Sequence, residues 1–225
     1  VIPLIGLLTL VINCGVQGNM ILSDNFNDGV IDPSKWVKVT SGVGPTIAES
    51  NGGLEVYFPA TSNNGTSGGF SAEYWSAQRY AGDFDIRVDF NTGEWPPGNG
   101  VRLGLTIASW YVTARISDVW GNDGREAYVL GHSGGLSGLG TADQSGAFRM
   151  VRKSGILTGY YWDDGWAQIG TGGGPVGEVY FGISAWSNDS LFGDRVVTAS
   201  FDNFIGYDRP EDRKSTRLNS SHRIR

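Results

Sequence analysis

The chain has 225 residues, with 35 Gly, 12% aromatic residues and a formal net charge of −6. This length suits one β-sandwich or barrel with a continuous core and is short for two. Residues 212–225 hold five basic residues and one acidic residue, so they contribute +4 and the rest of the chain carries −10. An acidic body repels phosphate backbones and anionic membranes, which argues against a nucleic-acid-binding protein.

The first 18 residues, VIPLIGLLTLVINCGVQG, have the pattern of a secretory signal and its cleavage region. The apolar run is too short for a membrane span, so no transmembrane span is expected in the mature domain. We expect residues 1–18 to be a signal-peptide remnant cleaved near Gly18, and the protein to be secreted, extracellular or periplasmic. Residues 11–14 loosely match a lipoprotein cleavage box, so anchoring through Cys14 is a less favoured alternative. Cys14 is the only cysteine, so the mature domain is expected to lack disulfides.

Short apolar segments separated by Gly, Asn, Asp and Pro predict about a dozen β-strands. The clearest is 84–90, FDIRVDF, in which apolar and charged residues alternate strictly. Residues 44–58 predict two strands joined by a turn at 50–53. Residues 131–146, GHSGGLSGLGTADQSG, are interpreted as a glycine-rich loop. Further strands are expected within 101–109, 111–117, 120–130, 147–155, 156–165, 166–172, 178–186 and 195–207. The pattern predicts an all-β, two-sheet antiparallel sandwich over residues 19–210.

Three stretches together resemble the concanavalin A-like lectin and glucanase superfamily, in particular its bacterial extracellular jelly rolls. They are SDNFNDGVIDPSKW at 23–36, FRMVRKSGILTGYYWDDGWAQIG at 148–170 and VTASFDNFIG at 197–206. In the second stretch, the Asp163–Gly165 turn explains the flanking Trp162 and Trp166 structurally, as rings that cover a hairpin end. The resemblance covers residues 21–207 and implies a jelly-roll fold.

Superfamily members that cut β-glucans or agar resemble residues 82–109 and carry Glu, Asp and Glu at alternating positions on the next strand. A retaining glycosidase needs two carboxyl groups about 5 Å apart. The corresponding segment here, YVTARIS at 111–117, places Thr113, Arg115 and Ser117 on one face and has no carboxylate. His132 has no nucleophile signature beside it, and no phosphate-binding loop is present. These observations favour a non-catalytic domain.

Sugar binding uses flat aromatic faces together with Asp, Asn and Arg side chains that bond hydroxyl groups. Trp36, Trp75 and Trp186 are expected in the core, and the aspartates of residues 83–89 on a polar outer face. The candidate ligand-binding residues beside loops and strand ends are Trp95, Trp110, Tyr111, Trp120, Asn122, Asp123 and Arg125.

The superfamily resemblance also implies a structural calcium that joins the first strand region to the last. The matching positions are Asp24 or Asn25 and Asp202, since calcium prefers oxygen ligands. Equally, Asp202 and Asn203 are explained by a role at a strand end alone. No other cofactor is expected.

The basic segment DRKSTRLNSSH at 212–222 resembles the translation of a widely used sequencing adapter. We therefore expect residues 211–225 to be an artefactual, disordered tail and the genuine protein to continue past Pro210 or Glu211. Without this tail, no basic patch remains that favours nucleic acid.

These observations lead to the expectation of an exported, non-catalytic module that binds carbohydrate or another cell-surface or matrix ligand. One alternative is a divergent glycoside hydrolase or polysaccharide lyase that uses Glu94, Asp118, Asp123 or Glu126. Another is a structural or adhesive domain of a longer surface protein.

Overall fold

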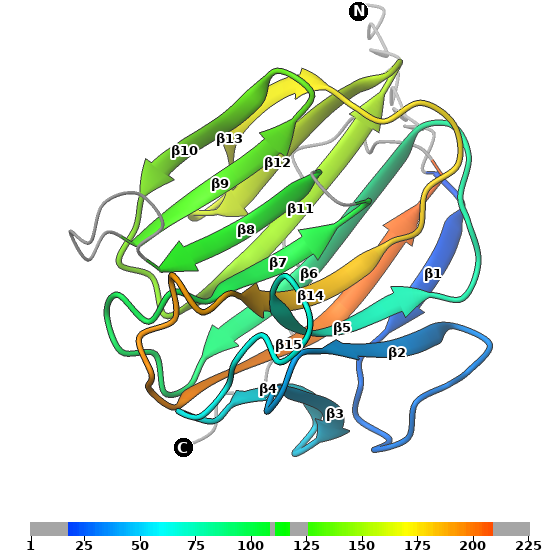
Figure 1. Ribbon diagram of the computed structural model, residues 1–225. Helices are drawn as coiled ribbons and strands as arrows, with labels where there is room; N and C mark the ends of the chain where they lie inside the picture. The colour runs from blue at the N-terminus through cyan, green and yellow to red at the C-terminus, as the bar shows by residue number, and fades with distance from the viewer. Residues whose placement is uncertain (1–17, 109–110, 118–125, 209–225) are drawn as a thin grey trace, which may run out of the picture.

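The computed structural model describes residues 18–108, 111–117 and 126–208, which form fifteen β-strands in two stacked antiparallel sheets (Figure 1). The strands are β1 (Met20–Asp24), β2 (Trp36–Ser41), β3 (Thr46–Ser50), β4 (Gly53–Phe58), β5 (Phe70–Ser76), β6 (Phe84–Thr92), β7 (Arg102–Thr106), β8 (Val112–Ser117), β9 (Glu126–His132), β10 (Gly135–Gly140), β11 (Ser145–Lys153), β12 (Ile156–Trp162), β13 (Trp166–Gly173), β14 (Gly182–Ser187) and β15 (Val197–Tyr207).

One sheet has seven strands in the order β10-β9-β8-β7-β14-β5-β2. The other has eight, with β13-β12-β11-β6-β15-β4-β3 in line and β1 paired to β15. Several strand pairs join distant parts of the sequence, such as β6 with β15 and β14 with β5, as in a jelly roll. Within the described residues, no helix is long and apolar enough to cross a membrane.

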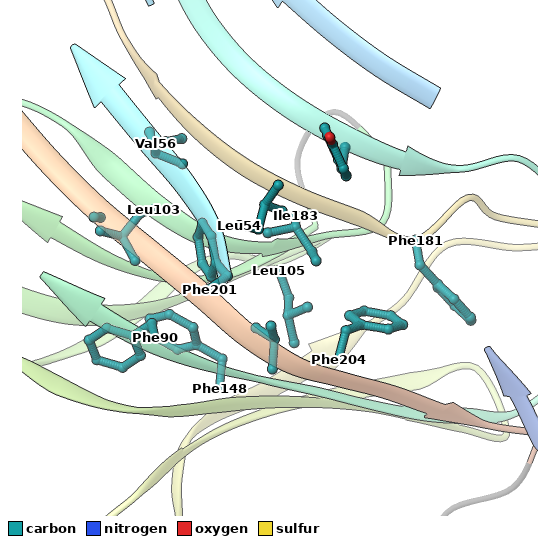
Figure 2. Packing of buried hydrophobic residues seen from close by; sticks show 14 of the residues in the cluster. Leu54, Val56, Phe90, Leu103, Leu105, Phe148, Phe181, Ile183, Phe201 and Phe204 are labelled. Carbon is teal, nitrogen blue, oxygen red and sulfur yellow. The ribbon is translucent and has the colours of Figure 1, made fainter. Parts of the chain in front are cut away.

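Alternating side chains from the two sheets meet in a continuous core. Strand β6 contributes Phe84, Ile86 and Val88, each with no exposed surface. Phe90 of β6 stacks on Phe148 of β11, with ring centroids 4.4 Å apart. Figure 2 shows side chains of both sheets, among them Leu105 and Phe201, filling the space between them. The inward face of each strand is thus committed to the core, which leaves the outward face for other roles.

The predicted all-β sandwich is confirmed, and so is the predicted strand at 84–90, which extends to Thr92. The hairpin at 44–58 is also confirmed, with Asn51 and Gly52 at positive φ in its turn. The expectation that the charged face of β6 is exposed is wrong for Asp85, which is 3% exposed. It is covered because Arg149 Nε donates to Asp85 Oδ1 at 2.8 Å.

The glycine-rich loop predicted at 131–146 is wrong, because residues 135–140 form the edge strand β10. The strand β5 was not predicted at all. The close approach of the two sheets here depends on glycines of the facing strand β13. A Cβ at Gly172 of β13 would lie 2.1 Å from His132 Nδ1, and one at Gly170 would lie 2.4 Å from Ser137 Cβ. The edges of the two sheets approach closely here because these positions lack side chains.

The predictions for the signal-peptide remnant, Cys14 and the tail at 211–225 lie outside the described residues. The first and last described segments of the chain are hydrogen-bonded to each other. The backbone N–H of Asn19 donates to Asp208 Oδ1 at 2.8 Å, beside the pairing of β1 with β15. The sandwich expected over 19–210 is therefore continuous as far as Asp208.

One charged side chain on the core side of β3 is buried without a partner. Glu49 is 8% exposed, and neither carboxyl oxygen has a hydrogen-bond partner among the described residues. Burial raises the pKa of Glu49 to about 7, and the nearby carboxylates of Asp24 and Asp28 raise it further, while Lys35 acts in the opposite direction. The folded protein therefore prefers the protonated form of Glu49.

Because the pKa of Glu49 rises from 4.5 in the unfolded chain to about 7 on folding, the folded state binds more protons between these values. The resulting stability is complete below about pH 4.5 and is lost as the pH rises through about 7. We expect Glu49→Gln to remove this fall, which amounts to up to about 3 kcal/mol, in urea unfolding at about pH 5 and about pH 8.

The matched control is Glu94→Gln, which changes an exposed carboxylate and should leave the pH dependence as in the wild type. Equal pH dependence in the wild type and in Glu49→Gln would contradict the prediction.

Candidate functional site

A groove of about 790 Å³ crosses the outer face of the seven-stranded sheet. Its floor is built from β5, β14, β7 and β8, and the segment between β13 and β14 forms one wall. The floor side chains come from alternate positions of these strands, because their neighbours in sequence face the core. The principal floor residues are Ser71, Glu73, Trp75, Thr106, Val112, Ser184 and Trp186.

Trp75 lies flat on the floor because the facing residue of β14 has no side chain. Gly182 pairs with Trp75 across the sheet, and a Cβ on it would lie 2.8 Å from the Trp75 ring. The Trp75 indole N–H donates to Glu73 Oε2, which fixes the ring in its plane. One face of the indole thus covers the backbone of β14, and the groove lies over the strand.

Trp186 forms a second aromatic part of the floor. It is partly buried and packs beside Ala114, Ile116 and Val129 on the outer face of β8 and β9. Between the two tryptophans, Ser184 Oγ donates to Thr106 Oγ1 at 3.1 Å. Ser184 is 2% exposed and Thr106 is 6% exposed, so this bond closes the floor between the two aromatic surfaces.

The wall, defined as residues 174–180, stands beside this floor. Tyr180 is 39% exposed, and the Arg79 guanidinium lies 5.0 Å from the centre of its ring. Glu178 and the fully exposed Val176 also line the groove. The site combines aromatic surfaces with two carboxylates, those of Glu73 and Glu178, and one guanidinium, which is a set that recognises polar, ring-shaped ligands.

Trp95, a predicted ligand-binding residue, is largely buried in the structure. It is 8% exposed, and its indole N–H donates to Glu126 Oε2 at 2.8 Å. The guanidinium of Arg115 lies 4.9 Å from the centre of its ring. Tyr111 is partly buried and packs against the main core. The remaining candidates, Trp110, Trp120, Asn122, Asp123 and Arg125, lie outside the described residues.

A polar network inside the sandwich explains the position of Trp95. Arg115, 1% exposed, pairs with Glu126, whose other oxygen accepts from the Ser117 hydroxyl. Burial lowers the pKa of Arg115, and the charge of Glu126 opposes this shift. Because Glu126 is committed to three interior donors, it does not serve as a free carboxylate in the groove.

The outer face of β8, which borders the groove, carries no acidic side chain. Thr113, Arg115 and Ser117 face the interior, and the outward residues are Val112, Ala114 and Ile116. The absence of a catalytic carboxylate on this strand therefore holds for both of its faces. Among the other acidic candidates, Glu94 is exposed at a loop, and Asp118 and Asp123 lie outside the described residues.

The residues expected to bind calcium do not come together as a ligand set. Asp24 Oδ2 already accepts from the Trp36 indole at 3.0 Å and pairs with the Lys35 ammonium at 3.4 Å. Asp24 faces Phe204 in the strand register, and Asn25 is exposed. The described residues contain no group of three or more acidic, His or Cys side chains that fits a metal ion. In this structure Lys35 and Trp36 engage the Asp24 carboxylate, and a structural calcium at these positions stays a prediction.

Asp202 instead stabilises a bulge in β15. Its carboxylate accepts from the backbone N–H of Asn203 at 2.6 Å, and Asn203 has a φ of 53°. The Asn203 amide also donates to Asp89 Oδ2 at 3.1 Å. Burial raises the pKa of Asp202, the Asn203 N–H lowers it and the charge of Asp89 raises it. These contacts match the alternative role at a strand irregularity.

Sequence reasoning missed the two tryptophans of the floor by assigning Trp75 and Trp186 to the core. Both are partly exposed in the groove. One signal could have identified Trp75. In SAEYWS at 71–76, Glu73 and Trp75 share a face, and a glutamate rarely points into a core.

No protein-family model matches the chain, and no curated protein matches it in sequence. Solved structures match it in fold. An alginate lyase from Corynebacterium sp. is 14% identical, with a TM-score of 0.57 over 78% of this chain and 95% of that one. A β-1,3-1,4-glucanase (lichenase) from a mouse hindgut metagenome is 13% identical, with a TM-score of 0.57 over 84% and 99%.

An alginate lyase from Klebsiella pneumoniae is 11% identical, also with a TM-score of 0.57, over 84% of this chain and 100% of that one. These matches and the two-sheet architecture identify the fold as a concanavalin A-like jelly roll, as the sequence resemblance predicted. At such identity the likeness concerns the fold alone.

Asp24→Asn should lower the free energy of unfolding by about 1–3 kcal/mol, because the carboxylate bonds Trp36 and Lys35. The loss should be the same in calcium and in chelator when measured by urea unfolding.

As a control, Asp163→Asn changes an exposed turn residue and should have little effect. A wild-type protein that loses stability in chelator, together with an Asp24→Asn variant that does not, would show that Asp24 binds a metal after all.

Proposed function

We propose that the groove on the seven-stranded sheet binds a carbohydrate chain and that the domain is a non-catalytic binding module. The observation that carries the proposal is the aromatic floor, in which the Trp75 ring lies flat beside the Glu73 carboxylate. A flat indole packs against the apolar face of a sugar ring, and carboxylate and hydroxyl groups bond its hydroxyls.

The solved structures of the same fold support this ligand class. Their titles describe alginate lyases and a β-1,3-1,4-glucanase, all of which act on polysaccharides. The open groove also suits an extended chain better than a small enclosed ligand. We take the signal-like sequence of residues 1–18 to mean that the protein is exported and meets its glycan outside the cytoplasm.

Binding without catalysis is favoured by the outer face of β8, whose described residues are apolar along the groove. A retaining glycosidase needs two carboxylates about 5 Å apart, and an inverting glycosidase needs a more widely spaced pair. In the described groove, the carboxylates belong to Glu73 on the floor and Glu178 on the wall. Glu73 is engaged by the Trp75 indole, which suits an orienting role.

Catalysis is the second candidate, because Glu73 and Tyr180 both line the groove and are groups that can move protons. A glycoside hydrolase would release reducing ends, whereas a polysaccharide lyase would release unsaturated products. If either product forms, Glu73→Gln should abolish its release while retaining binding.

Trp75→Ala and Trp186→Ala should each weaken binding about tenfold or more, because each removes an aromatic surface of the floor. The measurement is retention on a panel of neutral and anionic polysaccharides, followed by affinity titration with the ligand that is retained. The supernatant is assayed for reducing ends and unsaturated sugars in the same experiment.

Trp162→Ala is the matched control. Trp162 is also partly exposed, but it belongs to β12 in the other sheet and contacts Trp166 there. Its binding should match the wild type within about twofold. If no polysaccharide retains the protein, the carbohydrate proposal is overturned and a structural or adhesive domain is favoured. If sugar products are released, the proposal that the domain is non-catalytic is overturned.

A further inference from the structure

Apart from Val179, which is 4% exposed and belongs to the core, the wall at 174–180 has little packing of its own. This raises the question of what holds it beside the groove. Val176 at its tip is fully exposed, and Gly177 has a φ of 85°. Its ends are fixed by backbone bonds. Gly174 N–H donates to the Gly155 carbonyl at 2.8 Å, and Val179 and Tyr80 exchange two bonds of 3.0 and 2.8 Å.

The middle of the wall is held by one side chain from the other sheet. Arg152 of β11 is 3% exposed and points toward the interior at the end of the sandwich where the wall passes. Its Nη1 donates to the carbonyls of Pro175 at 3.3 Å and Gly177 at 2.9 Å. In the described part of the chain, no other side chain donates to these two carbonyls.

The same guanidinium also fixes the turn before β6. Arg152 Nε donates to the Gly82 carbonyl at 2.7 Å, and the guanidinium lies 4.7 Å from the centre of the Phe84 ring. The second terminal nitrogen, Nη2, is buried without a partner among the described residues. Burial lowers the pKa of Arg152, and the charge of Asp83 opposes this shift. Placing a charge here is costly, and a simple core position would be filled better by an apolar residue.

We propose that Arg152 is a positioning residue whose bonds to Pro175 and Gly177 set the wall of the groove and thereby its fit to a ligand. The wall carries Tyr180 and Glu178 to the groove, and Arg79 lies over the Tyr180 ring. The effect on ligand fit rests on the proposed carbohydrate function, whereas the effect on the wall does not.

Without the guanidinium, the carbonyls of Pro175 and Gly177 lose their donor and the wall is tethered only at its ends. The floor, which is part of the sheet, stays in place because Trp75 and Trp186 have no contact with Arg152. Arg152 therefore affects one side of the groove alone.

The test compares Arg152→Met with a matched control in the same sheet, measured at a temperature well below the unfolding midpoints of both. The control is the double variant Asp85→Asn, Arg149→Met, which removes a buried ion pair on the outer face of the same sheet. It should cost stability without touching the wall.

The first readout is hydrogen exchange at the amides of Gly174, Tyr80 and Val179, which donate the bonds that tether the wall. Exchange there should become at least about tenfold faster in Arg152→Met and should be unchanged in the control. The second readout is affinity for the retained polysaccharide, which should fall about tenfold in Arg152→Met and stay within about twofold in the control. Arg152→Lys keeps one cationic donor, so its amide exchange and its affinity should both lie between those of the wild type and those of Arg152→Met.

A merely structural residue would lower the unfolding midpoint without these local effects. Unchanged exchange at the three amides in Arg152→Met, or equal acceleration in the control, overturns the proposal. If Arg152→Met does not fold, the same exchange measurement on Arg152→Lys decides the matter. A wild-type protein that binds no glycan defeats the proposed function, while the exchange result still decides the role of Arg152.

Discussion

Packing between the two sheets determines which side of every strand is free to face a ligand. Inward side chains such as Phe90, Phe148 and Ile183 fill the interior completely, so they fix the orientation of each strand. A strand that slipped by one residue would turn its whole apolar set outward. The outward positions of β5 and β14 are consequently fixed as well, and they bring Glu73, Trp75 and Trp186 to one surface.

Two departures from ordinary strand chemistry turn that surface into a groove. Gly182 leaves room for the Trp75 ring to lie on the backbone of β14. The guanidinium of Arg152, buried at the end of the core, donates hydrogen bonds to two backbone carbonyls of the wall, those of Pro175 and Gly177. Both features cost stability, because glycine weakens a strand and a buried guanidinium must be desolvated. Their occurrence at the groove is what is expected of a functional site rather than of a core.

The fold was predictable because its main signal is local. Strict alternation in 84–90 predicted β6, and three short motifs pointed to the jelly roll. The edge strand β10 was missed because its own glycines suggested a loop, whereas the close approach of β13 depends on Gly170 and Gly172 of β13. A glycine needed for close approach and a glycine needed for a turn look the same in one sequence.

The site was less predictable, because it depends on which of two faces a large side chain occupies. Trp95 sits in a Pro- and Gly-rich loop, which favoured exposure, but its indole is drawn inside by Glu126, which is 31 residues away in sequence. Trp75 was assigned to the core because a sandwich of this size commonly uses its tryptophans there, although its ring lies in the groove. The calcium expectation came from the resemblance and stays a prediction, and the pairing of Lys35 with Asp24 could not be anticipated from the sequence.

The central claim, that the groove binds carbohydrate through its aromatic floor, is tested most directly by following the indole N–H signals of the eight tryptophans by NMR. Oligosaccharides of β-glucan and of alginate would be added in turn. The account predicts that the signals of Trp75 and Trp186 shift with a saturable ligand, while those of the buried Trp36 and Trp95 do not. Unchanged signals for Trp75 and Trp186 with every oligosaccharide, or shifts confined to other tryptophans, would contradict it.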